Sequence, residues 1–311
     1  MRESRLGFDV TAPGDGPSIS GHVEVDFYGG GAENRNVLML RHAHIDIDWD
    51  SGWSLLAGQY SDVISPLAPT TVNYPVAWWV GNIGYRRPQL RVSRRFGDAD
   101  GGLRVTAAVS RTIGDDFALE PGDSGVDSGR PTVQGRIAWE WRRGRNQAGF
   151  GVSGHQGVED LSDDFGEPGL DYESWSIGLD ARLPLGQRWL FKGEVWTGEN
   201  LDDYLGGIAQ GINLDGGVGV RSTGGWGSIE FRPSARLLLS AGAGVDDPRD
   251  EDLPVATVQT RTYNRSIWAN ALIDLGRGLS AGCEVSHWRT EHGELRAGDA
   301  LRFQTALIFS F

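Results

Sequence analysis

The chain has 311 residues and a net charge of −13, from 29 basic and 42 acidic side chains, and this acidic balance argues against a nucleic-acid partner. The mean hydropathy of −0.33 excludes a bundle of membrane-spanning helices but allows a membrane barrel, whose strands alternate between apolar and polar residues. The single cysteine, Cys283, excludes an internal disulfide framework and is interpreted as an apolar, lipid-facing residue.

The first residues contain no secretion signal. Residues 1–5 include two arginines and one glutamate, and they lead directly into Leu6 without the apolar stretch that a signal peptide requires. Two interpretations are open at this point. The protein is cytoplasmic, or its true N-terminus lies upstream of Met1.

Segments with alternating apolar and polar side chains recur about every twenty residues along the chain. A period of two indicates a β-strand with one apolar face, and about ten residues suffice for a tilted strand to cross a membrane. We predict fifteen such strands. They cover residues 4–12, 18–29, 36–49, 52–62, 87–97, 102–112, 131–143, 146–156, 173–184, 188–198, 223–233, 236–246, 261–275, 278–289 and 300–311.

The alternation assigns each side chain to one face of its strand. The last segment ends on Phe311, and bacterial outer-membrane barrels commonly close with such an aromatic-ended strand. The apolar face is expected to meet lipid and the charged face to line the interior. Accordingly, the residues expected to point outward are Trp139, Trp175, Ile177, Phe303 and Phe309, and those expected to point inward are Glu140, Asp180 and Arg302.

The connections between these strands alternate between short turns and long loops. Short turns such as Asp50–Gly52 and Pro184–Gln187 alternate with long loops such as residues 113–130 and 199–222. This is the asymmetry between the periplasmic and extracellular ends of an outer-membrane barrel. The sequence therefore predicts an all-β protein, a single antiparallel transmembrane β-barrel over residues 1–311. A soluble β-sandwich is the alternative fold.

The odd number of predicted strands leads to a further expectation. Bacterial single-chain barrels have an even number of strands with both ends on the periplasmic side, whereas fifteen strands place the two ends on opposite sides. We therefore expect a barrel of the sixteen-stranded type in which the first strand and the signal peptide are missing. The strands at 4–12 and 300–311 would then leave a gap or a strained closure between them.

Several segments resemble DcaP-like trimeric outer-membrane porins. They lie at residues 4–8, 21–31, 40–46, 55–66, 82–89, 198–201 and 205–212. The resemblance implies a sixteen-stranded homotrimeric channel in the bacterial outer membrane, in contact with lipid and lipopolysaccharide. It implies passage of small anionic solutes such as dicarboxylates and no enzymatic activity. An outer-membrane barrel enzyme or adhesin remains an alternative, although no convincing Ser/His pair is present on outward strands near the rim.

The longest uncharged segment, residues 63–85, is the expected pore loop. Pro66, Pro69 and Pro75 exclude a spanning helix. It is the third extracellular loop if the missing strand is counted, and by analogy with general porins it folds into the barrel and sets the size of the pore. Its aromatic residues suit packing against an inner wall; they are Tyr74, Trp78, Trp79 and Tyr85. The alternative is an ordinary external loop.

The following strand carries a series of inward arginines, Arg87, Arg91 and Arg95, and Arg136 and Arg182 are also expected to point inward. A guanidinium keeps its charge at any relevant pH and can bind a carboxylate through two hydrogen bonds. We therefore expect a basic path for anions. In the alternative, interior acids neutralise the arginines; these acids are Glu24, Asp26, Asp46, Asp48, Glu140 and Glu194.

Two other features do not fit this pattern. Strict alternation places Arg41 on the outer face, which requires shelter at a subunit interface or a different register. His42 and His44 lie two residues apart on one strand and could share a metal ion, but the sequence shows no third ligand nearby. We therefore predict no metal site, no other cofactor and no catalytic residue.

Overall fold

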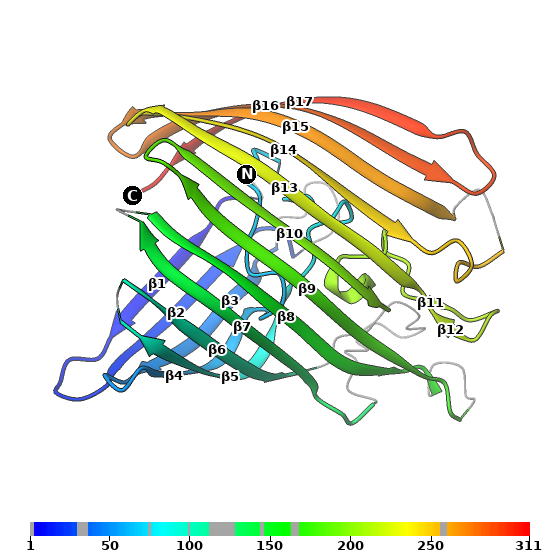
Figure 1. The fold of residues 1–311 in the computed structure, drawn as a ribbon, viewed down its shortest axis with the longest axis horizontal. Coiled ribbons are helices and arrows are strands. Elements are labelled where there is room, and N and C mark those ends of the chain that lie inside the picture. Colours follow the sequence, from blue (N-terminus) through cyan, green and yellow to red (C-terminus); the bar gives the residue numbers. More distant parts are fainter. Residues whose placement is uncertain are drawn as a thin grey trace.

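The computed structural model describes residues 3–29, 37–73, 76–98, 100–111, 128–143, 146–162, 168–255 and 260–311. Fifteen strands form one antiparallel sheet, in which each strand pairs with the next along the chain (Figure 1). In order they are β1 (Leu6–Thr11), β2 (Ser18–Asp26), β3 (Met39–Asp48), β4 (Trp53–Ser61), β5 (Arg86–Gly97), β6 (Gly101–Ser110), β7 (Thr132–Arg143), β8 (Asn146–Asp160), β9 (Asp171–Leu185), β10 (Trp189–Glu199), β13 (Arg221–Ser234), β14 (Leu237–Pro248), β15 (Arg261–Gly276), β16 (Leu279–His292) and β17 (Gly298–Phe309). The fifteen predicted strands are all present, within a few residues at each end.

The loop between β10 and β13 contains structure that the sequence pattern did not predict. A single 3₁₀ turn, η1 (Asp202–Tyr204), is followed by a two-stranded hairpin of β11 (Ile212–Asn213) and β12 (Val218–Gly219). These elements are two or three residues long, too short for an alternating pattern to be recognised. Within the described part of the chain, no helix is long and apolar enough to cross a membrane.

The sheet curves into a barrel wall around an interior that is partly filled by loops (Figure 1). Among the described residues, β1 pairs only with β2, and β17 pairs only with β16. The first and last strands are therefore the two free edges of the sheet. This confirms the prediction of fifteen strands, and β1 and β17 are not paired with each other in the described residues.

The outer face of the barrel is apolar. Trp139, Ile177, Phe303 and Phe309 are exposed there, as predicted, and Trp175 is half-buried. Many more exposed apolar side chains lie on the strands, including Val23, Ile45, Leu90, Val109, Val133, Val152, Leu179, Val195, Ile229, Ile267 and Leu307. Exposing so many apolar side chains to water is unfavourable, and this belt matches the lipid-facing surface of a transmembrane barrel.

Aromatic rings gather at the end of the barrel where the turns are short. The ring of Trp189, which begins β10, stacks on Phe231 near the end of β13 with centroids 4.2 Å apart. The rings of Trp141 and Phe150 lie 6.0 Å apart across another short connection. Aromatic side chains in this position form the interfacial girdle of membrane barrels. The short-turn end therefore lies at a membrane–water interface.

The inner face is polar, as predicted. Asp180 is buried and Glu140 is half-buried, and both bind Arg136. Arg302 is exposed because it lies on the free edge strand β17, but its partner across the strands is the buried residue Ser286. Residues opposite each other in a sheet project to the same face, so Arg302 belongs to the inner face.

A β-bulge at Arg41 explains its unexpected position. Glu24 pairs with His42 and Val25 pairs with Leu40, so Arg41 is an extra residue in β3. Its buried guanidinium contacts Glu24 and lies 2.7 Å from the carboxylate of Asp26. Strict alternation, which places Arg41 on the outer face, is wrong here because the bulge shifts the register between Leu40 and His42.

Candidate functional site

The loop between β4 and β5 lies inside the barrel, against strands that are distant in the sequence. Its backbone amides donate to side chains of the inner wall. Val63 N lies 2.6 Å from Gln134 Oε1 on β7, Leu67 N lies 2.7 Å from Glu194 Oε1 on β10, and Val72 N lies 2.7 Å from Glu284 Oε2 on β16. The loop therefore crosses the interior, which agrees with the expected pore loop and not with an external loop.

Wall side chains also bind the carbonyl groups of this loop. Asn270 Nδ2 donates to Thr70 O at 2.8 Å, Asn264 Nδ2 donates to Trp79 O at 2.8 Å, and Trp196 Nε1 donates to Gly81 O at 2.7 Å. Gly81 has a φ of +108°, and a Cβ there would collide with the carbonyl oxygen of Gly225 on β13. The close approach of loop and wall at this point therefore requires glycine.

Charged side chains of the wall serve as anchors for the loop. The carboxylate of Glu194 accepts from Leu67 N and also from Trp226 Nε1, at 3.0 Å. Lys192 Nζ lies 2.8 Å from Glu230 and donates to the carbonyl of Ala68 at 3.0 Å. The carboxyl groups of these wall acids therefore face amides of the loop, Trp226 or Lys192, and not the open part of the interior.

Arg87 is a structural anchor. Its side chain is only 1% exposed, with Nε 3.0 Å from Asp62 Oδ1 at the base of the loop. The guanidinium carbon lies 4.0 Å from the ring centroid of Tyr204, and Nη2 donates to Asp203 O at 3.2 Å. Burial raises the pKa of Tyr204, so the phenol stays neutral beneath this cation. Arg87 thus links β5 to two loops and is not accessible to a solute.

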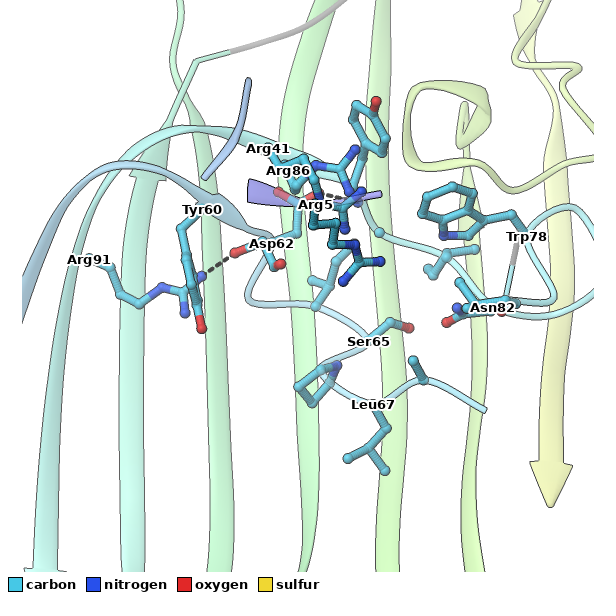
Figure 2. Close-up of a pocket in the computed structure, with 18 residues that line it drawn as sticks. Arg5, Arg41, Tyr60, Asp62, Ser65, Leu67, Trp78, Asn82, Arg86 and Arg91 are labelled. Carbon is cyan, nitrogen blue, oxygen red and sulfur yellow. Dashed lines mark hydrogen bonds between the residues drawn. The ribbon is translucent and has the colours of Figure 1, made fainter. Parts of the chain in front are cut away.

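Arg91 faces a cavity of about 440 Å³ beside the inserted loop (Figure 2). It donates to Ser61 O and, at 3.0 Å, to Gln89 Oε1, both neutral groups. Three further arginines line the same cavity, namely Arg5, Arg41 and Arg86. Among the described residues, no carboxylate lies within ion-pair distance of Arg5, Arg86 or Arg91. The cavity therefore carries an excess of positive charge.

Aromatic side chains support these arginines. The guanidinium of Arg86 lies 4.4 Å from the ring centroid of Tyr85, and that of Arg91 lies 5.2 Å from the centroid of Tyr60. Trp78, on the other side of the cavity, lies 5.8 Å from the ring of Tyr85. Cation–π contacts hold a guanidinium in place without neutralising its charge. The N–H groups that face the cavity therefore stay available to a solute.

The predicted arginine series does not converge on one point. Arg87 and Arg95 are eight residues apart on β5, which separates them by roughly 26 Å along the strand. Arg95 donates to Asp98 O at 2.8 Å near the short turns, where it lines a separate cavity of about 410 Å³. Of the three arginines, Arg91 alone faces the arginine-lined cavity.

The other predicted residues take different positions. Arg136 binds Asp180 through two hydrogen bonds of 2.7 and 2.9 Å, so its charge is neutralised. Arg182 donates to the carbonyl of Gln147 at 3.2 Å, near the short-turn end. Trp79 is half-buried, and its amide donates to Leu205 O at 3.0 Å in the other interior loop. Tyr74 lies outside the described residues.

Comparison with solved structures identifies the class of fold. OprB of Pseudomonas putida has a TM-score of 0.62 with this structure at 9% identity, covering 98% of this chain and 87% of that one. An anion-selective porin from Comamonas acidovorans has a TM-score of 0.59 at 12% identity, covering 97% and 86%. The protein therefore has the porin-type fold of an antiparallel β-barrel.

The outer membrane channel DcaP of Acinetobacter baumannii has a TM-score of 0.77 at 17% identity, covering 100% of this chain and 85% of that one. The resemblance that short sequence segments indicated is thus confirmed at the level of the fold, over the whole chain. No protein-family model and no curated protein matches the sequence.

Proposed function

We propose that the protein is an outer-membrane channel for passive diffusion of small hydrophilic solutes, with a preference for small anions such as dicarboxylates. The observation that carries this proposal is the arginine-lined cavity beside a loop that crosses the barrel interior (Figure 2). The porin-type fold and the apolar outer belt support a location in the outer membrane, in contact with lipid and lipopolysaccharide. By resemblance to DcaP-like porins, we also propose a homotrimer.

The preference for anions follows from where the charges lie. The net charge of −13 is a property of the whole chain, and salt screens the exposed acids over about 8–10 Å. A solute at the narrowest section responds to the few charges beside it, because low-dielectric walls strengthen their field. Arg86 and Arg91 are the unneutralised cations that we place on this path. Two guanidinium groups suit the two ends of a small dicarboxylate.

A channel explains the arrangement better than an enzyme does. His155 lies near two serine hydroxyls, with Nδ1 2.7 Å from Ser176 Oγ and Nε2 3.0 Å from Ser174 Oγ. However, this group faces inward, and the ring of Tyr204 covers it at a centroid distance of 4.0 Å. A substrate therefore has no access to these serines. No specific observation favours an adhesin.

The test is the reversal potential of the purified protein in a planar bilayer under a potassium chloride gradient. We expect the wild-type channel to prefer chloride, and the preference to fall in Arg91→Ala and further in the double variant Arg86→Ala/Arg91→Ala. Arg265→Ala is the matched control, because Arg265 is exposed and its neighbour Asn264 faces the interior. A channel that prefers cations, or selectivity that is unchanged in the double variant, would contradict the anion preference.

A further inference from the structure

Three of the six histidines form a cluster on the inner face of β2 and β3. The sheet register places His22 opposite His44 and Glu24 opposite His42. The ring centroids are 5.4 Å apart for His22 and His44, 6.0 Å for His22 and His42, and 6.2 Å for His42 and His44. The neighbouring strand β2 therefore brings His22 and Glu24 next to His42, which the spacing of residues along one strand could not show.

The ligand atoms of this cluster are close together. One atom from each of His22, Glu24 and His42 lies within 4.8 Å of the other two. In a tetrahedral site with bonds of about 2.0–2.1 Å, ligand atoms are about 3.3 Å apart. Small rotations of the three side chains would reduce the separations of the ligand atoms from within 4.8 Å to this value. The mixture of imidazole and carboxylate is typical of zinc, whereas calcium and magnesium prefer oxygen ligands alone.

Hydrogen bonds at the back of the imidazole rings leave one nitrogen of each free. His22 Nδ1 lies 2.7 Å from Asp9 Oδ1, so its Nε2 remains for a metal ion. His42 Nε2 lies 3.3 Å from Ser61 Oγ, and its Nδ1 is turned toward Glu24, 4.0 Å from Oε1. A carboxylate or hydroxyl behind a ligating histidine fixes the tautomer and the orientation of the ring.

His44 lies next to these three residues. Its side chain is only 7% exposed, and its Nε2 lies 3.0 Å from Asp46. Its Nδ1 is buried and has no hydrogen-bond partner among the described residues. His44 thus borders the cluster but is not one of the three residues whose ligand atoms converge.

We propose that His22, Glu24 and His42 bind a zinc ion on the inner wall of the barrel. Arg41 contacts Glu24 Oε1, which leaves Oε2 for the metal, and Asp26 balances the charge of Arg41. Asp9 and Asp46 add negative charge beside the ion. This site stands on the histidine geometry and does not depend on the proposed channel function.

The site borders the arginine-lined cavity. The ring of Tyr60 lies 4.9 Å from that of His42 and 4.6 Å from that of His44, and Tyr60 also lines the cavity. A bound zinc ion would therefore add two positive charges behind Tyr60.

The test uses the purified full-length protein in detergent, with Zn²⁺ titrated by calorimetry and Co²⁺ followed by visible absorption. We expect one Zn²⁺ per chain and the intense visible bands of a tetrahedral Co²⁺ site. His22→Ala and His42→Ala should weaken binding at least tenfold. Asp9→Asn, which leaves all ligands in place, should weaken it about tenfold through the orientation of His22.

His287→Ala is the matched control, because this half-exposed histidine lies on β16 and pairs with Asp299. Zinc affinity should be unchanged in this variant. Circular dichroism and heat-dependent gel mobility establish that each variant forms a barrel. Absence of Zn²⁺ binding by the wild type, or affinity equal to that of the wild type in folded His22→Ala and His42→Ala, would overturn the proposal.

Discussion

Arg87 Nε lies 3.0 Å from Asp62 Oδ1, and both side chains are 1% exposed. This buried ion pair connects the wall strand β5 to the base of the inserted loop. Gln134 Nε2 donates to the same carboxylate oxygen at 2.6 Å, while Gln134 Oε1 accepts from Val63 N. The position of the loop is thus fixed by one carboxylate that bridges β5 and β7.

We expect Arg87→Ala to release the base of the loop. The change leaves Asp62 buried without its cation, and breaking such a pair costs about 3–5 kcal/mol. Single-channel conductance should rise, and the thermal unfolding temperature should fall. Arg265→Ala, on the outer face, should change neither. Unchanged conductance in a folded Arg87→Ala channel would show that the ion pair does not hold the loop.

A second prediction concerns the contact between the loop and β13. In Gly81→Ala the new methyl group meets the carbonyl oxygen of Gly225, and the φ of +108° is unfavourable for alanine. The loop must move away from the wall, so we expect higher conductance and faster proteolysis of the loop. Gly135→Ala is the control, because a Cβ there comes no closer than 3.8 Å to Thr106 O. Equal behaviour of the two variants would contradict this assignment.

A third prediction concerns the loop after β14 at low pH. Hydrogen bonds from Arg221, at 2.6 Å to each carboxylate oxygen, lower the pKa of Asp252 below its ordinary value of 3.8. The stabilisation is therefore present above pH 3.8 and is lost as the pH falls through the lowered pKa. In the pH range from 3.8 down to the lowered pKa of Asp252, pepsin should cleave near the buried Leu253 only at the acidic end.

Asp252→Asn is the matched variant for this prediction. It has no carboxylate to titrate, so pepsin cleavage near Leu253 should already occur at the upper end of the range, where wild type resists. If wild type and Asp252→Asn show the same dependence on pH, the Arg221–Asp252 contact does not hold the loop.

A fourth prediction tests the lipid-facing belt. Val195 is 56% exposed at the centre of β10, whereas Val255 is 82% exposed in a loop. An arginine at the centre of a barrel's lipid-facing surface costs about 2–4 kcal/mol. We therefore expect Val195→Arg to destabilise the protein in phospholipid vesicles, as measured by urea unfolding. Val255→Arg should have little effect, although this valine is the more exposed of the two. Equal stability of both variants would place β10 outside the membrane.

The strands could be predicted from the sequence because a single rule governs all of them. Lipid outside and water inside force a change of polarity at every residue, as Trp139 and Glu140 show on β7. The bulge at Arg41 could not be predicted this way. A bulge depends on the partner strand, where Glu24 and Asp26 supply the carboxylates that draw the guanidinium inward.

The candidate site was predicted only in part. The inward direction of Arg87, Arg91 and Arg95 follows from alternation, but their roles depend on neighbours from distant segments. Arg87 meets Tyr204, which lies more than a hundred residues further along the chain. Arg86 was missed because both it and Arg87 are buried at the start of β5, where alternation breaks. Arg5 was missed because its place in the cavity depends on loop residues such as Asp62 and Trp78, which lie more than fifty residues further along the chain.

The inserted loop carries no formal charge in its described residues between Val63 and Tyr85, yet its amide dipoles face the carboxylates of Glu194 and Glu284. The loop is in effect an electrically neutral cap over an acidic lining. Deleting it would do more than widen the channel. We expect that the carboxyl groups of Glu194, Glu230 and Glu284 on β10, β13 and β16 would then become accessible to water and add negative charge to the interior. In this barrel, the stretch of chain that crosses the interior is also the one that covers its acidic side chains.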